Sequence, residues 1–140
     1  MSQKMILQIP REIYEAMVEQ ARRELPNECV GMLVGTAAGV VKERYPLVNE
    51  MESPKRFLSE PLSMFKAEKR RRAAGHEFLA IYHSHPGSPA TPSRLDVADH
   101  YFTEVMCVIV SLAGEAAQVR GWWIAEGQFS EGEIAVGTNS

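Results

Sequence analysis

With 140 residues, a formal net charge of −3 and a pI near 5.8, the chain has the size of one ordinary domain, and we expect residues 1–140 to form it. Nucleic-acid binding normally requires a strongly basic surface, so this acidic balance argues against that function. No apolar stretch is long enough to span a bilayer and the first residues lack the pattern of a secretory signal, so we expect a cytoplasmic protein without a membrane partner.

The N-terminal half predicts a strand, a helix and a hairpin, in that order. Met5–Ile9 has the apolar character of a strand, and Pro10 opens a helix that runs to about Leu25. The helix has one apolar stripe along its length, formed at four-residue spacing by Ile13, Met17, Ala21 and Leu25. Cys29–Val34 and Val40–Val48 then predict two strands joined by the turn TAAG, so we expect them to pair as a hairpin.

The C-terminal half mixes helices and strands without a regular βαβ series. Leu62–Ala74 predicts a helix ended by Gly75, and the apolar run Phe78–Tyr82 predicts a buried strand. A helix is expected to open after Pro92 and to cover Ser93–Phe102. The closing strands are expected at Val105–Leu112, Gln118–Ala125 and, more weakly, Phe129–Val136. This mixture predicts an α/β fold of the α+β type, with a curved, mostly antiparallel mixed sheet flanked by helices.

Two histidines follow the buried strand in the segment YHSHPGSPATPSRLD. In an extended chain, residues two apart point to the same face, so His83 and His85 can converge on one ion. A catalytic zinc usually takes a third protein ligand, and we expect Asp96, which shares a helix face with Ser93, to be that ligand. Three prolines stiffen the intervening loop and reduce the entropy lost in holding the site together. The spacing therefore predicts a metal site.

Each part of this pattern also has an ordinary structural explanation. Ser93 and Asp96 are spaced almost as in a helix capping box, and by themselves they favour that interpretation. A His-x-His pair on a strand is more often polar decoration than a pair of ligands. Their combination, after a buried strand and on a proline-stiffened loop, favours the metal site over both explanations.

The same residues carry a family resemblance. The string His83-Ser-His85-Pro, the gap to Ser93-x-x-Asp96 and an upstream Glu28 within PNECVGMLVG closely resemble the JAMM motif of the MPN-plus zinc metallopeptidases, the Mov34/PAD family. SPKRF before a helix and a closing run of strands resemble the segment order of a short bacterial member. The resemblance implies a cytidine-deaminase-like MPN fold, whose sheet is of the type expected from the element pattern.

Carried over to this chain, the resemblance implies one zinc ion, bound by His83, His85 and Asp96. It also implies that Glu28 is the general base and that Ser93 helps to hold the oxyanion. Zinc lowers the pKa of bound water toward about 7, and a nearby carboxylate can accept the proton as hydroxide attacks a peptide carbonyl. By composition alone Glu28 would be an unremarkable surface carboxylate. Its setting beside the apolar run GMLVG suggests an acid at the edge of the core.

The function implied by the resemblance is that of a zinc peptidase or isopeptidase. Short bacterial JAMM proteins act on ubiquitin-like sulfur-carrier proteins and remove residues that follow, or are joined to, a diglycine tail. Such a tail could lie extended along a sheet edge beside the zinc, with Asn49–Phe57 as a wall of the groove. The alternative is a non-catalytic, metal-free MPN scaffold that binds a protein partner, although scaffolds usually lack the ligands that this chain keeps. A zinc nucleobase deaminase would need His-x-Glu and Pro-Cys-x-x-Cys patterns, which the sequence lacks. The oligomeric state stays open.

The remaining features have ordinary explanations. Residues 66–72 form a basic helical patch, most often a solvated helix face, although it could dock an acidic partner. Trp122 and Trp123 point to opposite sides of a strand, so one is expected in the core, while the other could cover a groove. His76 and His100 lack the spacing to bind the metal, and only His100 could support a ligand. Two residues are expected as buried thiols, Cys29 and Cys107.

Overall fold

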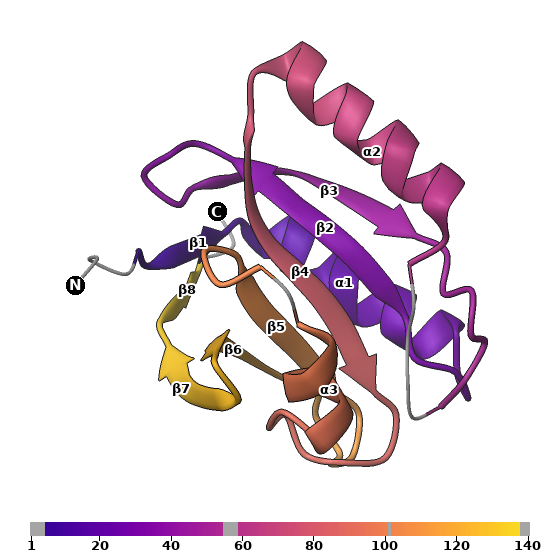
Figure 1. The fold of residues 1–140 in the computed structure, drawn as a ribbon. Coiled ribbons are helices and arrows are strands. Elements are labelled where there is room, and N and C mark those ends of the chain that lie inside the picture. The colour runs from indigo at the N-terminus through magenta and orange to yellow at the C-terminus, as the bar shows by residue number, and fades with distance from the viewer. Residues whose placement is uncertain (1–4, 55–58, 101, 138–140) are drawn as a thin grey trace.

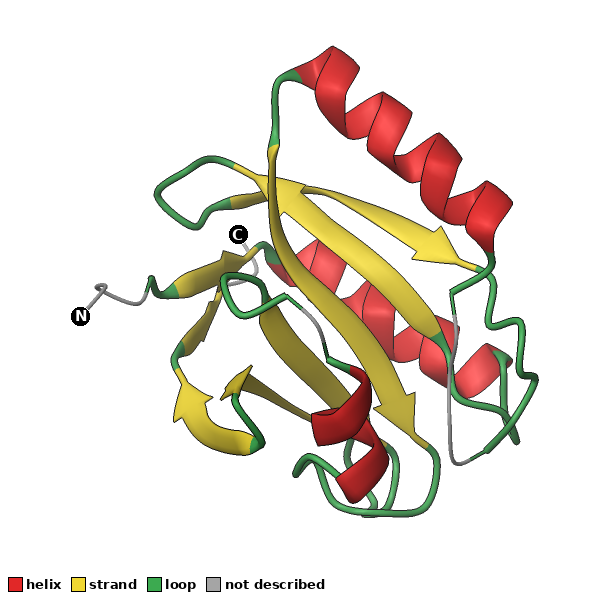
Figure 2. Cartoon of the chain, in the orientation of Figure 1, coloured by secondary structure: helices red, strands yellow, loops and turns green. Residues whose placement is uncertain are grey.

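The computed structural model describes residues 5–54, 59–100 and 102–137. The helices and strands of these residues follow one another as β1 (Leu7–Ile9), α1 (Arg11–Arg23), β2 (Val30–Gly35), β3 (Val41–Leu47), α2 (Pro61–Ala74), β4 (Glu77–His85), α3 (Arg94–Asp99), β5 (Met106–Ser111), β6 (Gln118–Ala125), β7 (Gln128–Gly132) and β8 (Ile134–Val136). Figure 1 traces this path, and Figure 2 shows the helices arranged around a twisted central sheet.

Six strands form the central sheet, in the order β3-β2-β4-β5-β6-β7. Every neighbouring pair is antiparallel except β4 and β5, which run parallel. The short strands β1 and β8 pair in parallel with each other as a second sheet. Because parallel neighbours need a crossover connection, the chain between β4 and β5 is long enough to hold α3 and the proline-rich loop. The mixed, mostly antiparallel sheet predicted from the sequence is therefore confirmed.

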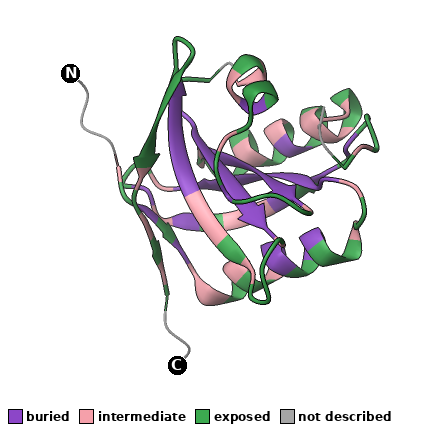
Figure 3. Cartoon of the chain, turned by 90° about the horizontal axis from the view of Figure 1, so that it is seen from below, coloured by how far each residue is buried: buried purple, intermediate pink, exposed green. Residues whose placement is uncertain are grey.

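The central sheet carries helices on both faces (Figure 1). α1 contributes Met17 and Ala21 to the core cluster on one face. On the opposite face, α2 contributes Ala67 to a second cluster and α3 packs Val97 against a third. Figure 3 shows that the inner strands hold much of the buried part of the chain. Because successive strand residues point to opposite faces, β4 sends Tyr82 toward α1 and the residues on either side of it toward α2 and α3.

Local sequence explains the ends of α2. Glu60 caps its start, since the carboxylate accepts hydrogen bonds from the amides of Leu62 and Ser63 at 3.2 and 2.8 Å. Gly75 ends it with a left-handed φ of 72°, a conformation that favours glycine. The predicted end of this helix is therefore confirmed. Neither α2 nor any other helix in the described ranges has the length and apolar character to cross a membrane.

The prediction for α3 was too long, because the helix ends at Asp99 and not at Phe102. The backbone of His100 is already extended, with φ −87° and ψ 112°. Its Nε2 atom lies 2.8 Å from the carbonyl oxygen of Phe102 and 3.0 Å from that of Val105, so the ring donates to the chain that follows. This hydrogen bonding turns the chain toward β5 instead of continuing the helix.

The prediction of one continuous strand over Phe129–Val136 is wrong, because two strands occupy this segment. The chain forms β7 up to Gly132, leaves the central sheet and pairs with β1 as β8. A Cβ atom on Gly132 would lie 2.7 Å from Trp123 Nε1 and 2.9 Å from Met106 Cε. The chain therefore passes too close to the core for a side chain at this bend, a position typical of a strand glycine.

Candidate active site

Both histidines of the motif lie at the end of β4 and point to the same face of the sheet. His83 pairs with Val30 of β2 and with Ile109 of β5, so this end of β4 has a strand on each side. The two histidines are 0% and 3% exposed, and His83 Nε2 lies 3.3 Å from His85 Nε2. The alternation predicted for an extended chain therefore brings the two rings together in a buried place.

Asp96, in the first turn of α3, completes the group. Its Oδ1 atom lies 3.0 Å from His83 Nε2, and its Oδ2 atom lies 2.9 Å from His85 Nε2. Among the described residues, these three form the one group of at least three His, Cys, Asp or Glu side chains with ligand atoms within 4.8 Å of one another. The residues predicted as metal ligands are thus brought together, and we call them the ligand cluster.

Ser93 holds Asp96 in place through a helix capping box. Ser93 Oγ accepts a hydrogen bond from the Asp96 amide at 3.1 Å, and the Ser93 amide donates to Asp96 Oδ2 at 2.9 Å. The sequence offered the capping box and the metal site as alternatives, yet the structure contains the capping box and the ligand cluster together. Ser93 is exposed, so its hydroxyl proton can reach a bound molecule.

The hydrogen bonds of the proline-rich loop suit a metal ligand. His85 Nδ1 donates to the carbonyl of Pro89 at 2.7 Å, which leaves the lone pair of Nε2 for an ion. Trp122 Nε1 donates to the carbonyl of Ala90 at 2.8 Å and ties the same loop to β6. Two imidazole nitrogens and one carboxylate are ligands that catalytic zinc takes. The ligand cluster therefore fits a divalent metal ion.

Burial and charge act in opposite directions on the pKa values of the ligand cluster. Burial lowers the pKa of His83 below 6.5 and so favours its neutral ring. Burial disfavours the charged form of Asp96, but hydrogen bonds from both histidines outweigh it and hold the pKa of this carboxyl well below 3.8. Burial also opposes the charge of His85, although its bonds to Asp96 and Pro89 raise its pKa above 6.5. Asp96 therefore stays negative, which favours a cation at this point.

Glu28 lies two residues before β2 and is 3% exposed. Its buried Oε1 atom has no hydrogen-bond partner among the described residues. Burial raises the pKa of Glu28 to about 8, while the charge of His85 lowers it and that of Asp96 raises it. Val30 pairs with His83 and the Ser84 amide donates to the Cys29 carbonyl, so the antiparallel register brings the main chain of Glu28 toward His85. The sequence placed this acid at the edge of the core, and its burial agrees.

Two polar side chains that sequence reasoning missed hold the main chain beside Glu28. Asn49 Nδ2 donates to the Glu28 carbonyl at 2.9 Å, and Ser84 Oγ accepts from the Cys29 amide at 2.8 Å. The position of Ser84 between the two histidines was a usable signal, whereas Asn49 looked like any polar loop residue. The predicted groove wall at 49–57 is described only as far as residue 54.

The other candidates from the sequence lie outside the ligand cluster. His76 Nδ1 lies 3.5 Å from Glu43 Oε1. The ring of His100 donates to the carbonyl of Phe102, just beyond the end of α3. Trp122 and Trp123 lie in core clusters on opposite faces of the sheet, at 6% and 8% exposure, so both are buried where the sequence predicted only one in the core. Both cysteines are buried and free, as predicted.

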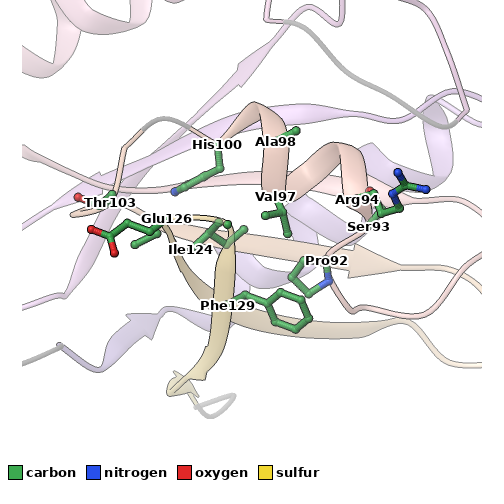
Figure 4. A pocket seen from close by; sticks show the side chains of 12 residues that line it. Pro92, Ser93, Arg94, Val97, Ala98, His100, Thr103, Ile124, Glu126 and Phe129 are labelled. Carbon is green, nitrogen blue, oxygen red and sulfur yellow. The ribbon is translucent and has the colours of Figure 1, made fainter.

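A pocket of about 760 Å³ lies beside α3 (Figure 4). One wall contains Ser93, Val97 and His100 from the α3 segment, and the other contains Ile124 and Phe129 from β6 and β7. The pocket shares Ser93 with the capping box, but it is not lined by the ligand cluster or by the general-base candidate. The pocket therefore lies next to the ligand cluster but does not contain it.

A comparison with protein families accounts for this arrangement. Residues 10–125 match the family model described as prokaryotic homologs of the JAB domain. The chain belongs to this family. The JAMM resemblance predicted from the motif is thereby confirmed for most of the chain.

Relatives of this JAB-domain protein have names that describe cleavage. It is 37% identical over 125 residues to the "Probable TtuB-protein conjugate cleaving protease" of Thermus thermophilus, covering 89% of this chain and 80% of that one. It is 30% identical over 133 residues to the "CysO-cysteine peptidase" of Mycobacterium tuberculosis, covering 94% and 91%.

Solved structures support the fold of this JAB-domain protein. A protein from Desulfitobacterium hafniense, solved in solution, superimposes with a TM-score of 0.87 at 31% identity, covering 96% of this chain and 94% of that one. A JAB1/MPN domain protein from Archaeoglobus fulgidus superimposes with a TM-score of 0.59 at 20% identity, covering 93% and 98%, and speaks for the fold alone.

Proposed function

We propose that this JAB-domain protein is a zinc-dependent peptidase or isopeptidase that hydrolyses the bond after the diglycine tail of a ubiquitin-like sulfur-carrier protein. The observation that carries the proposal is the buried ligand cluster, together with the β2–β4 register that brings the buried Glu28 toward His85. Burying charged and polar groups is unfavourable unless they are paired, and a protein that served only as a scaffold would not need them here. The names of the two relatives, which refer to TtuB-protein conjugates and to CysO-cysteine, support the substrate class.

One zinc ion per chain would be held by His83, His85 and Asp96. When bound, zinc lowers the pKa of water toward about 7 and polarises the substrate carbonyl. The chain presents these ligands in fixed orientations, because the capping box holds Asp96 and the Pro89 carbonyl holds the ring of His85. Little rearrangement is then needed when the ion binds.

Glu28 would accept the proton of the attacking water and return it to the leaving amine. Burial raises its pKa to about 8, and a cation bound at the ligand cluster would favour its ionised form. A carboxyl that titrates near neutral pH is suited to both transfers. Its buried Oε1 atom has no hydrogen-bond partner among the described residues, so no bond to the protein competes with proton transfer there.

Ser93 would donate its hydroxyl proton to the negative charge that develops on the carbonyl oxygen. Its Oγ atom already accepts from the Asp96 amide, and this contact fixes the oxygen while leaving the proton free to point at substrate. The exposure of Ser93 at the rim of the ligand cluster supports this role.

The loop after β3 would guide the diglycine tail. The Glu28 amide donates to the carbonyl of Ser53 at 2.7 Å, so this loop lies directly beside the general base. A chain that passes Glu28 in an extended form would meet the loop, where two glycines need less room than residues with side chains. We further infer a cytoplasmic location, because the two buried thiols are typical of a reducing compartment.

The test uses sulfur-carrier proteins that bear a short C-terminal extension after the diglycine, with products weighed by mass spectrometry. Matched carriers have the two glycines replaced by alanines. We expect zinc-loaded protein to release the extension only from the diglycine form, chelation to stop the reaction, and added zinc to restore it. Cleavage of no carrier at any zinc concentration would favour the scaffold.

Glu28→Gln supplies the catalytic control. The variant keeps the size of the side chain and the ligand cluster, so we expect full zinc content. Its rate should fall by ~10²- to 10⁴-fold, as is usual when a general base is lost. Cleavage at the wild-type rate would remove Glu28 from the mechanism.

A further inference from the structure

The carboxyl group of Glu28 is oriented mainly through its main chain. Its buried Oε1 atom has no hydrogen-bond partner among the described residues, so no contact there fixes the direction of the side chain. A general base must nevertheless lie within hydrogen-bond reach of the proton that it accepts. The position of this carboxyl must therefore come from the backbone dihedrals and from packing.

Two side chains form hydrogen bonds with the peptide group that joins Glu28 to Cys29. The carbonyl of Glu28 accepts from Asn49 Nδ2 at 2.9 Å, and the amide of Cys29 donates to Ser84 Oγ at 2.8 Å. Both polar atoms of one peptide plane are thus held, each by a different element of the fold. On the other side of the residue, the Glu28 amide donates to the carbonyl of Ser53 at 2.7 Å. These bonds fix the direction in which the side chain of Glu28 leaves the backbone.

Asn49 is itself fixed by the loop it begins. It is 6% exposed, and its Oδ1 atom accepts from the amide of Met51 at 3.0 Å while Nδ2 donates to Glu28. The Glu52 amide also donates to the Asn49 carbonyl at 3.2 Å. The side-chain amide offers its donor and its acceptor on two separate atoms, and Asn49 uses both. Aspartate would keep the acceptor for Met51 and lose the donor for Glu28.

We propose that Asn49 is a positioning residue for the reaction, which acts by holding the Glu28 carbonyl and thereby aiming the general base at the ligand cluster. The role rests on the proposed function. Asn49 contacts the main chain of Glu28 and belongs to no ligand group, so it affects the base without taking part in metal binding. A misplacement of about 1 Å in an active site can lower a rate by ~100-fold, so a single lost hydrogen bond can matter.

The first test compares Asn49→Ala and Asn49→Asp with a matched control, Gln20→Ala. Gln20, in α1, is also buried, and its side-chain amide donates at 3.2 Å to the carbonyl of Val30, two residues after Glu28. We expect both Asn49 variants to lose ~10- to 100-fold in kcat with full zinc content. Gln20→Ala should keep kcat within about twofold of the wild type, even if its melting temperature falls as much as those of the Asn49 variants. Wild-type kcat in Asn49→Asp would overturn the proposal, because the donor would then be dispensable.

A double-mutant cycle with Glu28→Gln shows whether Asn49 acts through the base. If it does, Asn49→Ala should change the residual rate of Glu28→Gln by less than about twofold, since there is no base left to aim. A role in gripping substrate, or general destabilisation, would lower the rate by the same factor in both backgrounds. That additive result would overturn the proposal even though the enzyme is active.

Amide hydrogen exchange gives a readout that needs no substrate. In the zinc-loaded wild type we expect the amides of Glu28 and Cys29 to be protected. Asn49→Ala should speed their exchange by at least ~10-fold, while Gln20→Ala leaves these two amides unchanged relative to the rest of β2. If the wild type cleaved no carrier, the proposed function would fail, while the exchange data would still decide whether Asn49 holds the peptide group after Glu28. Unchanged protection at Glu28 and Cys29 in Asn49→Ala would overturn it.

Discussion

Replacing Asp96 should separate metal binding from folding, because this carboxylate serves both the ligand cluster and the cap of α3. Asp96→Ala removes the oxygens that lie 3.0 and 2.9 Å from the histidine Nε2 atoms. A four-ligand structural zinc site contributes about 10–16 kcal/mol, or about 2.5–4 kcal/mol per ligand, so we expect zinc binding to weaken by ~10²- to 10³-fold.

The fold should lose much less. A capping interaction contributes about 1 kcal/mol, which in a domain of this size corresponds to a melting temperature lower by about 3–5 °C. The hydrophobic clusters that hold α1 and α2 to the sheet do not include Asp96, and its removal leaves them intact. The variant should therefore stay folded while it loses the ion.

Zinc affinity would be measured by competition with a chromogenic chelator, and stability by thermal unfolding of the zinc-free proteins. Asp99→Ala is the matched control, since it removes an acid from the same helix that is not in the ligand cluster. It should bind zinc as the wild type does. Wild-type affinity in Asp96→Ala would show that Asp96 is not a ligand. A wild type that unfolds at room temperature without zinc would make the site structural and would contradict the proposed catalytic role.

Three further outcomes follow from the site and the core. Ser93→Ala should lower kcat by ~10²- to 10³-fold through loss of one oxyanion donor, whereas Ser93→Thr keeps the hydroxyl and should retain most activity; equal rates in both variants would exclude that role. Zinc affinity should fall as the pH falls, by about tenfold per unit once His85 is protonated, because the ion competes with that proton. Since the pKa of His85 is raised above 6.5, the decline should begin above that pH, and an affinity independent of pH between about 5.5 and 8.5 would contradict the ligand assignment. Burial raises the pKa of Cys29 to about 11 and also raises that of Cys107, so neither thiol of the folded protein should react quickly with a disulfide reagent at pH 8, and rapid labelling of either one would contradict the burial.

The ligand cluster could be predicted because its geometry is mostly local. Alternation along a strand places His83 and His85 on one face, and the first turn of a helix places Asp96 beside its cap. The structure adds only that the end of β4 and the start of α3 meet, which the short proline-rich connection favours. Burial of Glu28 could be anticipated for a similar reason, since an apolar strand follows it directly.

The features that sequence reasoning missed depend on particular side-chain contacts, some of them between residues far apart in the chain. The bend between β7 and β8 follows from the approach of Gly132 to Trp123 and Met106, which no local pattern reveals. The end of α3 depends on a histidine ring that reaches carbonyls beyond the helix. Asn49 reaches the Glu28 carbonyl across 21 positions, and before folding it resembles any polar residue in a turn. Propensity and periodicity cannot report contacts of this kind.

Asp96 shows why two explanations of one motif need not compete. Its Oδ2 atom accepts from the Ser93 amide and also faces His85, while Oδ1 faces His83, so one carboxylate serves both the cap and the ligand cluster. An ionised carboxylate has about four lone-pair sites, enough for both. The cap also restricts the side-chain rotamer of Asp96, which reduces the entropy lost when an ion binds. The serine three residues before Asp96 therefore holds this carboxylate in one orientation, and the ordinary capping box is part of the geometry of the ligand cluster.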